Sequence, residues 1–243
     1  MTQTLRIGTA RFMIRPWGND PGAAAVGVAR PGSAVGVREV HQMVSRLADS
    51  GVHHLVTTAL GPGDSHVFRK AGFEDIEQLT VLRHDLAGSP SRWREAVSAV
   101  RDAAVPVGIR KGRNSHRGSV LEVDRAAFGG YWTMGAAGLD DALTATRTVR
   151  LRLAVGTRIT GFSVCGKSAR TGFLQRLAVD PRAQGSGIGR ALVADALLWM
   201  RRRRATSLLV NTPVDNAIAL HLYDSLGFHR ELDGLTVLEH LGS

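Results

Sequence analysis

The stretch LAVDPRAQGSGIGRALVADALLWM, from Leu177 to Met200, carries the strongest structural signal in the chain. Its first residues are typical of a β-strand, which Asp180 and Pro181 stop. After a glycine-rich loop, apolar residues recur at helical spacing, at Ile188, Leu192, Ala196, Trp199 and Met200. The segment therefore predicts a strand, a glycine loop and a helix in direct succession.

The glycine loop has the properties of an anion site. Its three glycines are Gly185, Gly187 and Gly189. Without side chains, their backbone N–H groups can approach an anion closely, and the positive end of the following helix dipole favours one. Arg182 and Arg190 add guanidinium groups that suit phosphate oxygens. We therefore expect this loop to cradle a pyrophosphate.

Two nucleotide-binding motifs compete with this interpretation, and both fail on context. GFSVCGKS, Gly161 to Ser168, matches the phosphate-loop pattern, but its residues alternate like a half-buried strand and another strand-like run follows where a helix is required. We interpret Gly166 to Gly172 as the turn of a hairpin. A dinucleotide fingerprint needs G-x-G-x-x-G and a later acidic residue, whereas the next strand here ends in Asn211 and Thr212.

Around the loop, the apolar periodicity predicts a mixed α/β protein. Strands are expected at 106–111, 148–155, 159–166, 172–179, 207–211 and 235–240, and helices at 119–128, 139–146, 187–202 and 215–226. Helices that connect neighbouring strands imply a sheet that is partly parallel and covered by helices.

A second motif follows the loop at a fixed distance. Gln184-x-x-Gly187-x-Gly189 is followed by Asn216-x-x-Ala219-x-x-Leu222-Tyr223 and then by Leu226-Gly227-Phe228. Together with the strand before the loop, these motifs resemble the GNAT superfamily of acetyl-CoA-dependent N-acetyltransferases. The resemblance covers about 106 to 241, and its second half is most similar to the ribosomal-protein alanine N-acetyltransferases.

The resemblance implies a GNAT fold, in which helices flank a mixed central sheet, and a function. Acetyl would move from acetyl-CoA to a primary amine, either a protein N-terminal α-amine or a small-molecule amine, by direct attack in a ternary complex. Tyr223 would be catalytic and would hydrogen-bond the leaving thiolate. The residues implied to bind acetyl-CoA are Leu177, Ala178, Val179, Gln184, Gly185, Ser186, Gly187, Ile188, Gly189, Arg190 and Asn216. The acceptor pocket would involve Phe128, Tyr131 and Trp132.

The chain departs from the common family pattern at the general base. Many relatives place a carboxylate on the strand before the glycine loop, but TGFLQRLAV contains none before Asp180. We therefore assign no base and expect an α-amine or another amine of low pKa as the acceptor. One alternative function is a non-catalytic module that binds or senses acetyl-CoA, and another is a nucleotide binder of the phosphate-loop type.

The chain also contains an internal repeat. VFRKAGFEDIEQLTVLRHDL, Val67 to Leu86, resembles LYDSLGFHRELDGLTVLEHL, Leu222 to Leu241. We therefore predict a degenerate partial GNAT-like domain at 1–88, a linker helix at 89–105 and a catalytic GNAT domain at 106–243, in a tandem arrangement resembling that of mycothiol synthase. The first copy has Ser33 and Arg38 in place of Gln184 and Gly189, so we expect it not to bind acetyl-CoA.

Composition bounds the remaining possibilities. The chain has 243 residues, 44% of them apolar, and its single cysteine, Cys165, excludes an internal disulfide. The net charge is +10, of which residues 89–243 contribute +9, but aromatic residues make up only 5%, so nucleic acid is not an expected partner. We find no secretory signal, membrane span or metal-ligand spacing, and we expect a cytoplasmic protein without a metal site.

Overall fold

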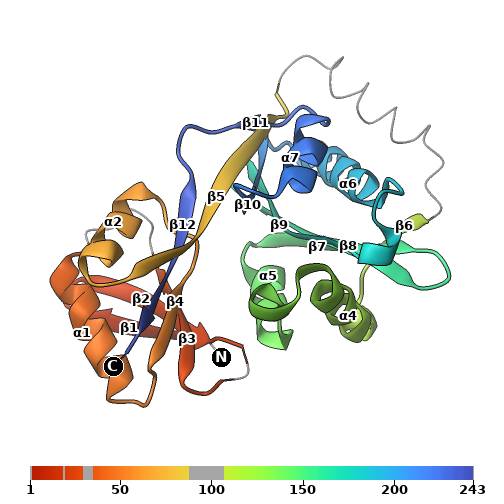
Figure 1. The fold of residues 1–243 in the computed structure, drawn as a ribbon. Helices are drawn as coiled ribbons and strands as arrows, with labels where there is room; N and C mark the ends of the chain where they lie inside the picture. The colour runs from red at the N-terminus through yellow and green to blue at the C-terminus, as the bar shows by residue number, and fades with distance from the viewer. Residues whose placement is uncertain (1, 19, 30–34, 88–106, 243) are drawn as a thin grey trace. The chain divides into compact units, whose positions relative to one another are not determined.

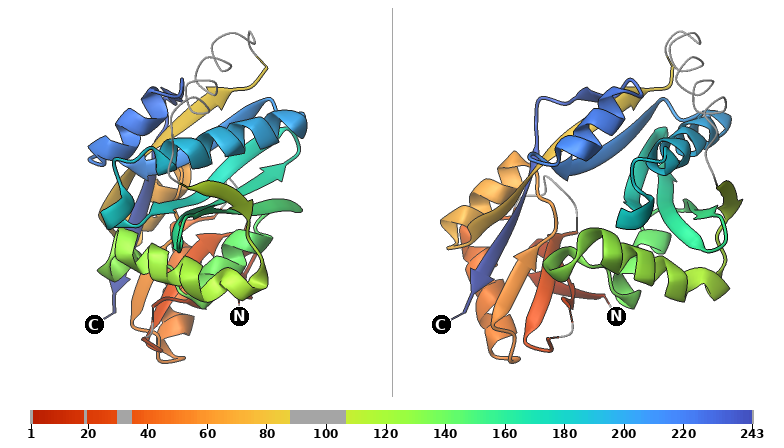
Figure 2. Two further views of the ribbon diagram at one scale, coloured as in Figure 1. Left: turned by 90° about the vertical axis from the view of Figure 1, so that its right-hand side faces the viewer. Right: turned by 45° about the vertical axis from the view of Figure 1, so that its right-hand side comes forward.

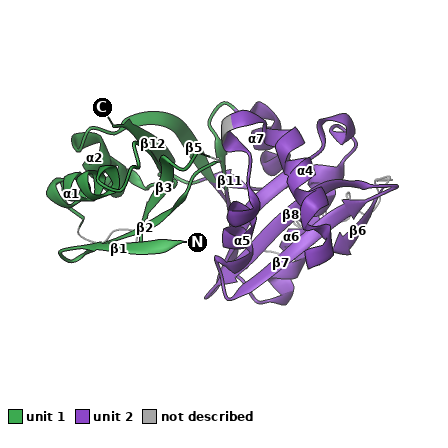
Figure 3. Cartoon of the chain, turned by 90° about the horizontal axis from the view of Figure 1, so that it is seen from below, with its two compact units in different colours: residues 1–81, 211–215, 231–243 green, residues 82–210, 216–230 purple. Residues whose placement is uncertain are grey.

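The computed structural model describes residues 2–18, 20–29, 35–87 and 107–242 (Figure 1). The linker helix predicted at 89–105 lies outside the described residues, as does Ser33. The chain forms two compact units (Figure 3), which we call unit 1 (1–81, 211–215 and 231–243) and unit 2 (82–210 and 216–230). Strands β5 (Glu74–Asp85) and β10 (Ser207–Pro213) each contribute residues to both units.

Unit 2 contains a mixed sheet. After β10, the strands follow the spatial order β9 (Thr171–Val179), β8 (Ile159–Ser168), β7 (Thr148–Val155) and β6 (Gly108–Lys111). β9 pairs in parallel with β10, whereas the β9–β8, β8–β7 and β7–β6 pairs are antiparallel. The short strand β11 (His229–Arg230) pairs with the end of β5. The sheet confirms the predicted mixed α/β class.

Helices cover both faces of this sheet (Figures 1 and 2). α4 (Arg117–Phe128) and α5 (Ala136–Thr144) pack on one face, against apolar residues of β7 and β8 that include Leu153 and Phe162. α6 (Ile188–Arg202) and α7 (Ala217–Asp224) pack on the other face, where Leu174 belongs to their core. Single helical turns lie at η1 (Asn114–His116), η2 (Gly130–Trp132) and η3 (Pro181–Ala183). The sequence-derived bounds of these elements differ from the observed ones by a few residues.

The stretch GFSVCGKS is strand rather than phosphate loop, as predicted, but the expected half-burial is wrong. Gly161 to Gly166 are all buried, because helices cover both faces of the sheet. β8 runs through Ser168 and β9 begins at Thr171, so the hairpin turn is narrower than the expected Gly166 to Gly172. Ala169 takes a left-handed conformation with φ of 49° to make this tight turn. Lys167 pairs with Gly172 inside the ladder, which leaves no helix N-terminus beside it.

Unit 1 has a similar order of elements. It contains β1 (Gln3–Ile7), β2 (Ala10–Pro16), β3 (Ala23–Val28), α1 (Val37–Ala48), β4 (His54–Thr57), α2 (Pro62–Lys70) and β5. β3 pairs in parallel with β4 and α1 connects them, as α6 connects β9 and β10. The tandem arrangement of two related units is therefore visible in the topology, and the first unit has no counterpart of α4 and α5 among the described residues.

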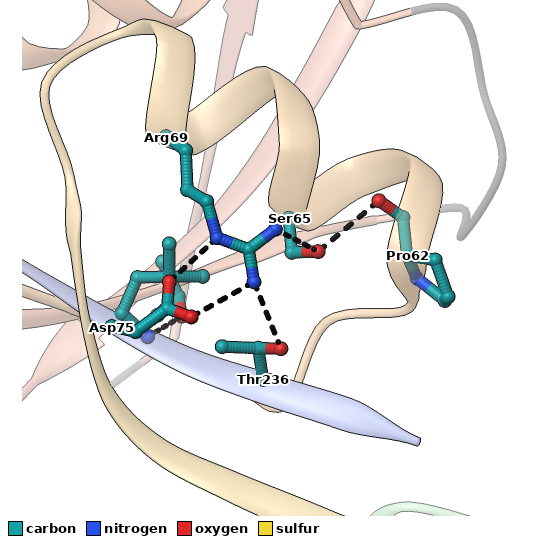
Figure 4. Close-up of polar contacts among 7 residues, drawn as sticks. Pro62, Ser65, Arg69, Asp75 and Thr236 are labelled. Carbon is teal, nitrogen blue, oxygen red and sulfur yellow. Dashed lines mark hydrogen bonds and ion pairs between the residues drawn. The ribbon is translucent and has the colours of Figure 1, made fainter. Parts of the chain in front are cut away.

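The C-terminal strand β12 (Leu235–Leu241) completes the sheet of unit 1. It lies between β4 and β5 and pairs antiparallel with both. Arg69 on α2 donates from Nε and Nη2 to the two carboxylate oxygens of Asp75 at 2.6 and 3.0 Å and from Nη2 to Thr236 Oγ1 at 3.2 Å (Figure 4). Arg69 also holds the pKa of the Asp75 carboxyl below its usual value. The two compact units therefore differ in their bounds from the domains predicted from the repeat, at 1–88, 89–105 and 106–243, and those domains stay a prediction.

Candidate functional site: a strand that splits from its neighbour

The site begins where β9 leaves β10. Only Thr171, Gly172 and Phe173 pair with β10, opposite Ser207, Leu208 and Leu209. Along the rest of β9, from Leu174 to Val179, the ladder to β8 continues but no pairing with β10 is found among the described residues. One edge of this segment is therefore available to an extended ligand, which can hydrogen-bond to it as an added strand does.

The glycine loop follows directly at the end of that edge. Gly185 and Gly187 have φ of 75° and 80°, which L side chains rarely adopt, and Gly187 is the N-cap of α6. The first N–H groups of α6 have no acceptor within the helix and point toward the loop. The positive end of the helix dipole lies at the same place. Ser186 Oγ donates to Ala183 O and keeps the loop closed upon itself. This geometry suits a diphosphate.

The acidic residue beside the loop is neutralised. The carboxylate of Asp180 accepts the backbone N–H of Arg182 at 2.9 Å and a guanidinium N–H of Arg158 at 2.7 Å. The backbone hydrogen bond from Arg182, followed by the contacts with Arg158, lowers the pKa of Asp180. Its negative charge is thus compensated and does not repel an anion bound at the loop.

Three predicted cofactor residues have partners in the structure. Gln184 donates from Nε2 to Val179 O at 3.1 Å, which links the loop to the end of β9. Arg190 donates to Ser225 Oγ at 2.8 Å, and Asn216 Oδ1 caps α7 by accepting Ala219 N–H at 3.0 Å. Arg190 therefore links the first turn of α6 to the end of α7, and Asn216 caps the start of α7.

Tyr223 is the buried residue of α7, and its side chain packs in the core with residues of β9. Its side chain is only 4% exposed and belongs to the same apolar cluster as Leu174 and Leu177 of β9. Its ring lies 5.4 Å from that of Phe228, centroid to centroid. Burial raises the pKa of its hydroxyl above the usual value, so the group stays protonated over the working pH range. No hydrogen bond from this hydroxyl to another described residue is found, which leaves it available to a ligand.

The acceptor residues predicted from FGGYWTM lie at the end of α4 and in the turn that leads to α5. Phe128 ends α4 and is 39% exposed, and Trp132 ends η2. The side chain of Tyr131 lies outside what the structure describes. Beside α4, a cavity of about 460 Å³ is lined by Ser119, Glu122, Arg158 and Arg182, among others. Both features lie on the α4 side of the sheet.

Sequence reasoning missed two residues on this side. Arg176, on β9, and Asp124, on α4 and fully buried, form an ion pair in which Nε donates to Oδ2 at 2.7 Å. The available signal was a charged residue within each of two apolar patterns, FLQRLAV and SVLEVDRAAF. Charges at such positions are rare unless they are paired.

Two classes of feature do not occur in the part of the chain that the structure describes. No helix there is long and apolar enough to cross a membrane. No group of three or more His, Cys, Asp or Glu side chains there is arranged to hold a metal ion.

Comparison with known proteins agrees with this geometry. A family model described as the acetyltransferase (GNAT) family matches residues 120–228. Mycothiol acetyltransferases of Rhodococcus opacus and Rhodococcus jostii are 30% identical over 184 and 222 residues, which are 70% and 89% of this chain. These matches span only 58% and 61% of the two relatives.

A solved structure extends the likeness to the whole arrangement of elements. A tandem GNAT protein from the clavulanic acid biosynthesis pathway superimposes with a TM-score of 0.69 at 13% identity. The superposition includes 98% of this chain and 81% of the other protein's chain. At that identity, it supports the tandem fold alone. The split strand and the glycine loop lie within residues 120–228, and the family match over these residues shows that this chain contains a domain of the GNAT acetyltransferase family.

Proposed function

We propose that this protein transfers acetyl from acetyl-CoA to a primary amine of low pKa, by direct attack within a ternary complex. The observation that carries the proposal is the opening between β9 and β10, with a free strand edge that ends at a glycine loop and a helix N-terminus. An extended amide chain with a terminal diphosphate, which is the form of coenzyme A, fits these two features in sequence.

The roles of individual residues follow from their places along this opening. The backbone of Leu177, Ala178 and Val179 would pair with the pantetheine arm, and the N–H groups from Gly185 to Arg190 would hold the diphosphate. Asn216 would contact the arm with its amide nitrogen, since its oxygen already caps α7. Tyr223 would donate a hydrogen bond to the sulfur as thiolate charge develops.

The choice of amine rests on the carboxylates around the site. Asp180 and Asp124, the acidic side chains that contact β9 or its end, are both bound to arginines and neither is free to remove a proton. Neutralising a lysine side chain at pH 7 costs about 4.6 kcal/mol, whereas neutralising an α-amine costs about 1.4 kcal/mol. Since no base is assigned among the described residues, we propose the α-amine of a peptide or small molecule as the easier acceptor.

We also propose that the two copies differ in role. Residues 106–243 would form the catalytic copy and residues 1–88 a degenerate one. At the start of α1, Arg38 stands where α6 has Gly189, and its side chain is 83% exposed. An arginine at this position fills space that a bound diphosphate needs, although its charge alone would attract one.

The test measures CoA thiol release and acetylated product over a panel of amines. Each peptide is supplied in two forms, one with a free α-amine and blocked lysine and one with the reverse. Because the relatives are named mycothiol acetyltransferases, the panel also contains the unacetylated amine form of mycothiol. Product on α-amines is expected. A strong preference for lysine side chains at neutral pH would refute the acceptor class, and acetyl-CoA binding without any product would favour the sensing module instead.

A further inference from the structure

A β-bulge in β9 redirects one side chain toward the α4 side of the sheet. The ladder to β8 pairs Val164 with Arg176 but Cys165 with Leu174, so Gln175 is the extra residue. Leu174 packs with α6, on the opposite face, and regular alternation would send Arg176 to that same face. Because of the bulge, Arg176 instead points to α4, where it meets Asp124.

The ion pair holds more than two side chains together. Arg176 Nη2 donates to Asp124 Oδ1 and to the carbonyl oxygen of Trp132, both at 2.8 Å. Asp124 Oδ1 also accepts the backbone N–H of Met134 at 2.7 Å. The guanidinium carbon of Arg176 lies 3.5 Å from the ring centroid of Phe128, so the ring is stacked on the cation.

These contacts fix the segment that connects α4 with α5. Gly129 and Gly130 both have positive φ, 60° and 40°, and turn the chain sharply after Phe128. The segment then has two backbone anchors, Trp132 O and Met134 N, on a single ion pair. A turn with two consecutive glycines has many conformations available, and the anchors select one of them.

We propose that Arg176 is a positioning residue for the amine acceptor. Through Asp124, it fixes residues 129–134 and presents the exposed ring of Phe128 as one wall of the acceptor site. This inference rests on the proposed acetyl transfer. Both carboxylate oxygens of Asp124 are occupied by this network, so the pair orders the site and does not act as a general base.

The network predicts separate effects on stability and on acceptor binding. Removal of one partner leaves a buried charge without its counterpart, whereas replacement of both by apolar residues of similar size is often neutral. In the double variant D124L/R176M, the melting temperature should therefore recover relative to D124L alone. D124L removes the Met134 anchor, and the double variant also removes the Trp132 anchor, so the acceptor segment should stay loose in the double variant although its stability recovers.

The experiment uses the full chain and four variants: D124L, R176M, their combination and R176K. In the double variant, the KM for the acceptor should rise about 10- to 100-fold, as for other misplaced substrates, while the Kd for acetyl-CoA changes less than about twofold. The acceptor KM of R176K should lie between those of the wild type and the double variant, because lysine keeps one charge–charge contact with Asp124 but lacks the planar guanidinium fork. Hydrogen exchange of residues 129–134 should quicken in the double variant.

A matched control lies on the other face of the sheet. Asp195 on α6 accepts from Arg152 Nε and Nη2 at 3.1 and 2.9 Å, the same two-pronged contact that Arg176 makes with Asp124, and also from Arg150 Nη2 at 3.1 Å. D195N should lower the melting temperature but leave the acceptor KM unchanged. A double variant with the wild-type acceptor KM and wild-type exchange at 129–134 would overturn the proposal. If the proposed transfer itself fails, the wild type acetylates nothing, and the exchange measurement alone then decides the role of the pair.

Discussion

Replacement of Tyr223 by phenylalanine removes one hydroxyl from a core that otherwise keeps its shape. The side chain is 4% exposed, and its ring contacts, including that with Phe228, are retained by the variant. Since the hydroxyl makes no hydrogen bond to another described residue, its loss leaves no such partner unsatisfied. Folding stability should therefore change by less than about 0.5 kcal/mol or rise slightly.

Turnover should respond much more strongly. A hydrogen bond to a charged group is worth about 1.5–3 kcal/mol, and charge on sulfur develops only as the thioester breaks. At about 1.4 kcal/mol for each factor of ten, kcat should fall about 10- to 150-fold. Acetyl-CoA affinity should stay within about twofold, because the ground-state thioester is neutral and accepts hydrogen bonds weakly. Burial raises the pKa of the Tyr223 hydroxyl, so no loss of activity from its ionisation is expected below about pH 10.

Three measurements on wild type and Y223F check this prediction. Single-turnover transfer to an α-amine peptide gives the chemical step, calorimetric titration gives the Kd for acetyl-CoA, and urea unfolding gives stability. An equal loss of affinity and turnover would show that the hydroxyl contributes to binding in general. An unchanged chemical step would refute the role of Tyr223 altogether.

Three further predictions concern the loop, the buried cysteine and a buried histidine. Gly187→Ala should cost about 1–2 kcal/mol, because φ is 80° there, and should weaken acetyl-CoA binding. Gly189→Ala should keep the melting temperature, since the added methyl would lie 3.4 Å from Leu222 Cδ2, an ordinary contact; equal destabilisation by the two changes, measured by calorimetry, would contradict the loop geometry. Burial raises the pKa of the Cys165 thiol, so iodoacetamide should modify it at neutral pH only after urea unfolds the protein, and fast modification of the native chain would be inconsistent with this burial. Burial lowers the pKa of His84, so its stabilising contribution, complete above the unfolded value of about 6.5, should decline as pH falls below that value. Urea unfolding between about pH 7.5 and 5.5 should show this decline in the wild type and a flatter profile in H84F, and identical profiles would refute it.

The secondary structure of unit 2 was predictable because its periodicity is strong. The helical spacing after Gly187 arises from residues buried against the sheet, and burial is what that pattern records. GFSVCGKS was predictable as a strand from its alternation, but helices bury both faces of its first six residues. The family resemblance was predictable for a different reason. The glycine loop needs residues without side chains, and that requirement produces a glycine motif that is easy to recognise in the sequence.

Other features depend on contacts between distant segments. The bulge at Gln175 is invisible in FLQRLAV, since one extra residue changes the facing of Arg176 without any change in composition. The pair with Asp124 then joins positions 52 residues apart. The place of β12 between β4 and β5 was equally hidden, because strand order is set by tertiary packing.

The most direct test of the central claim is calorimetric titration of the intact chain with acetyl-CoA, beside Gly187→Ala as the control. Saturable binding to one site per chain is expected, with competition from free CoA and a clear loss of affinity in the control variant. Absence of heat and of any melting shift in the wild type, or equal affinity in the variant, would contradict the assignment of the split strand and glycine loop as the coenzyme site.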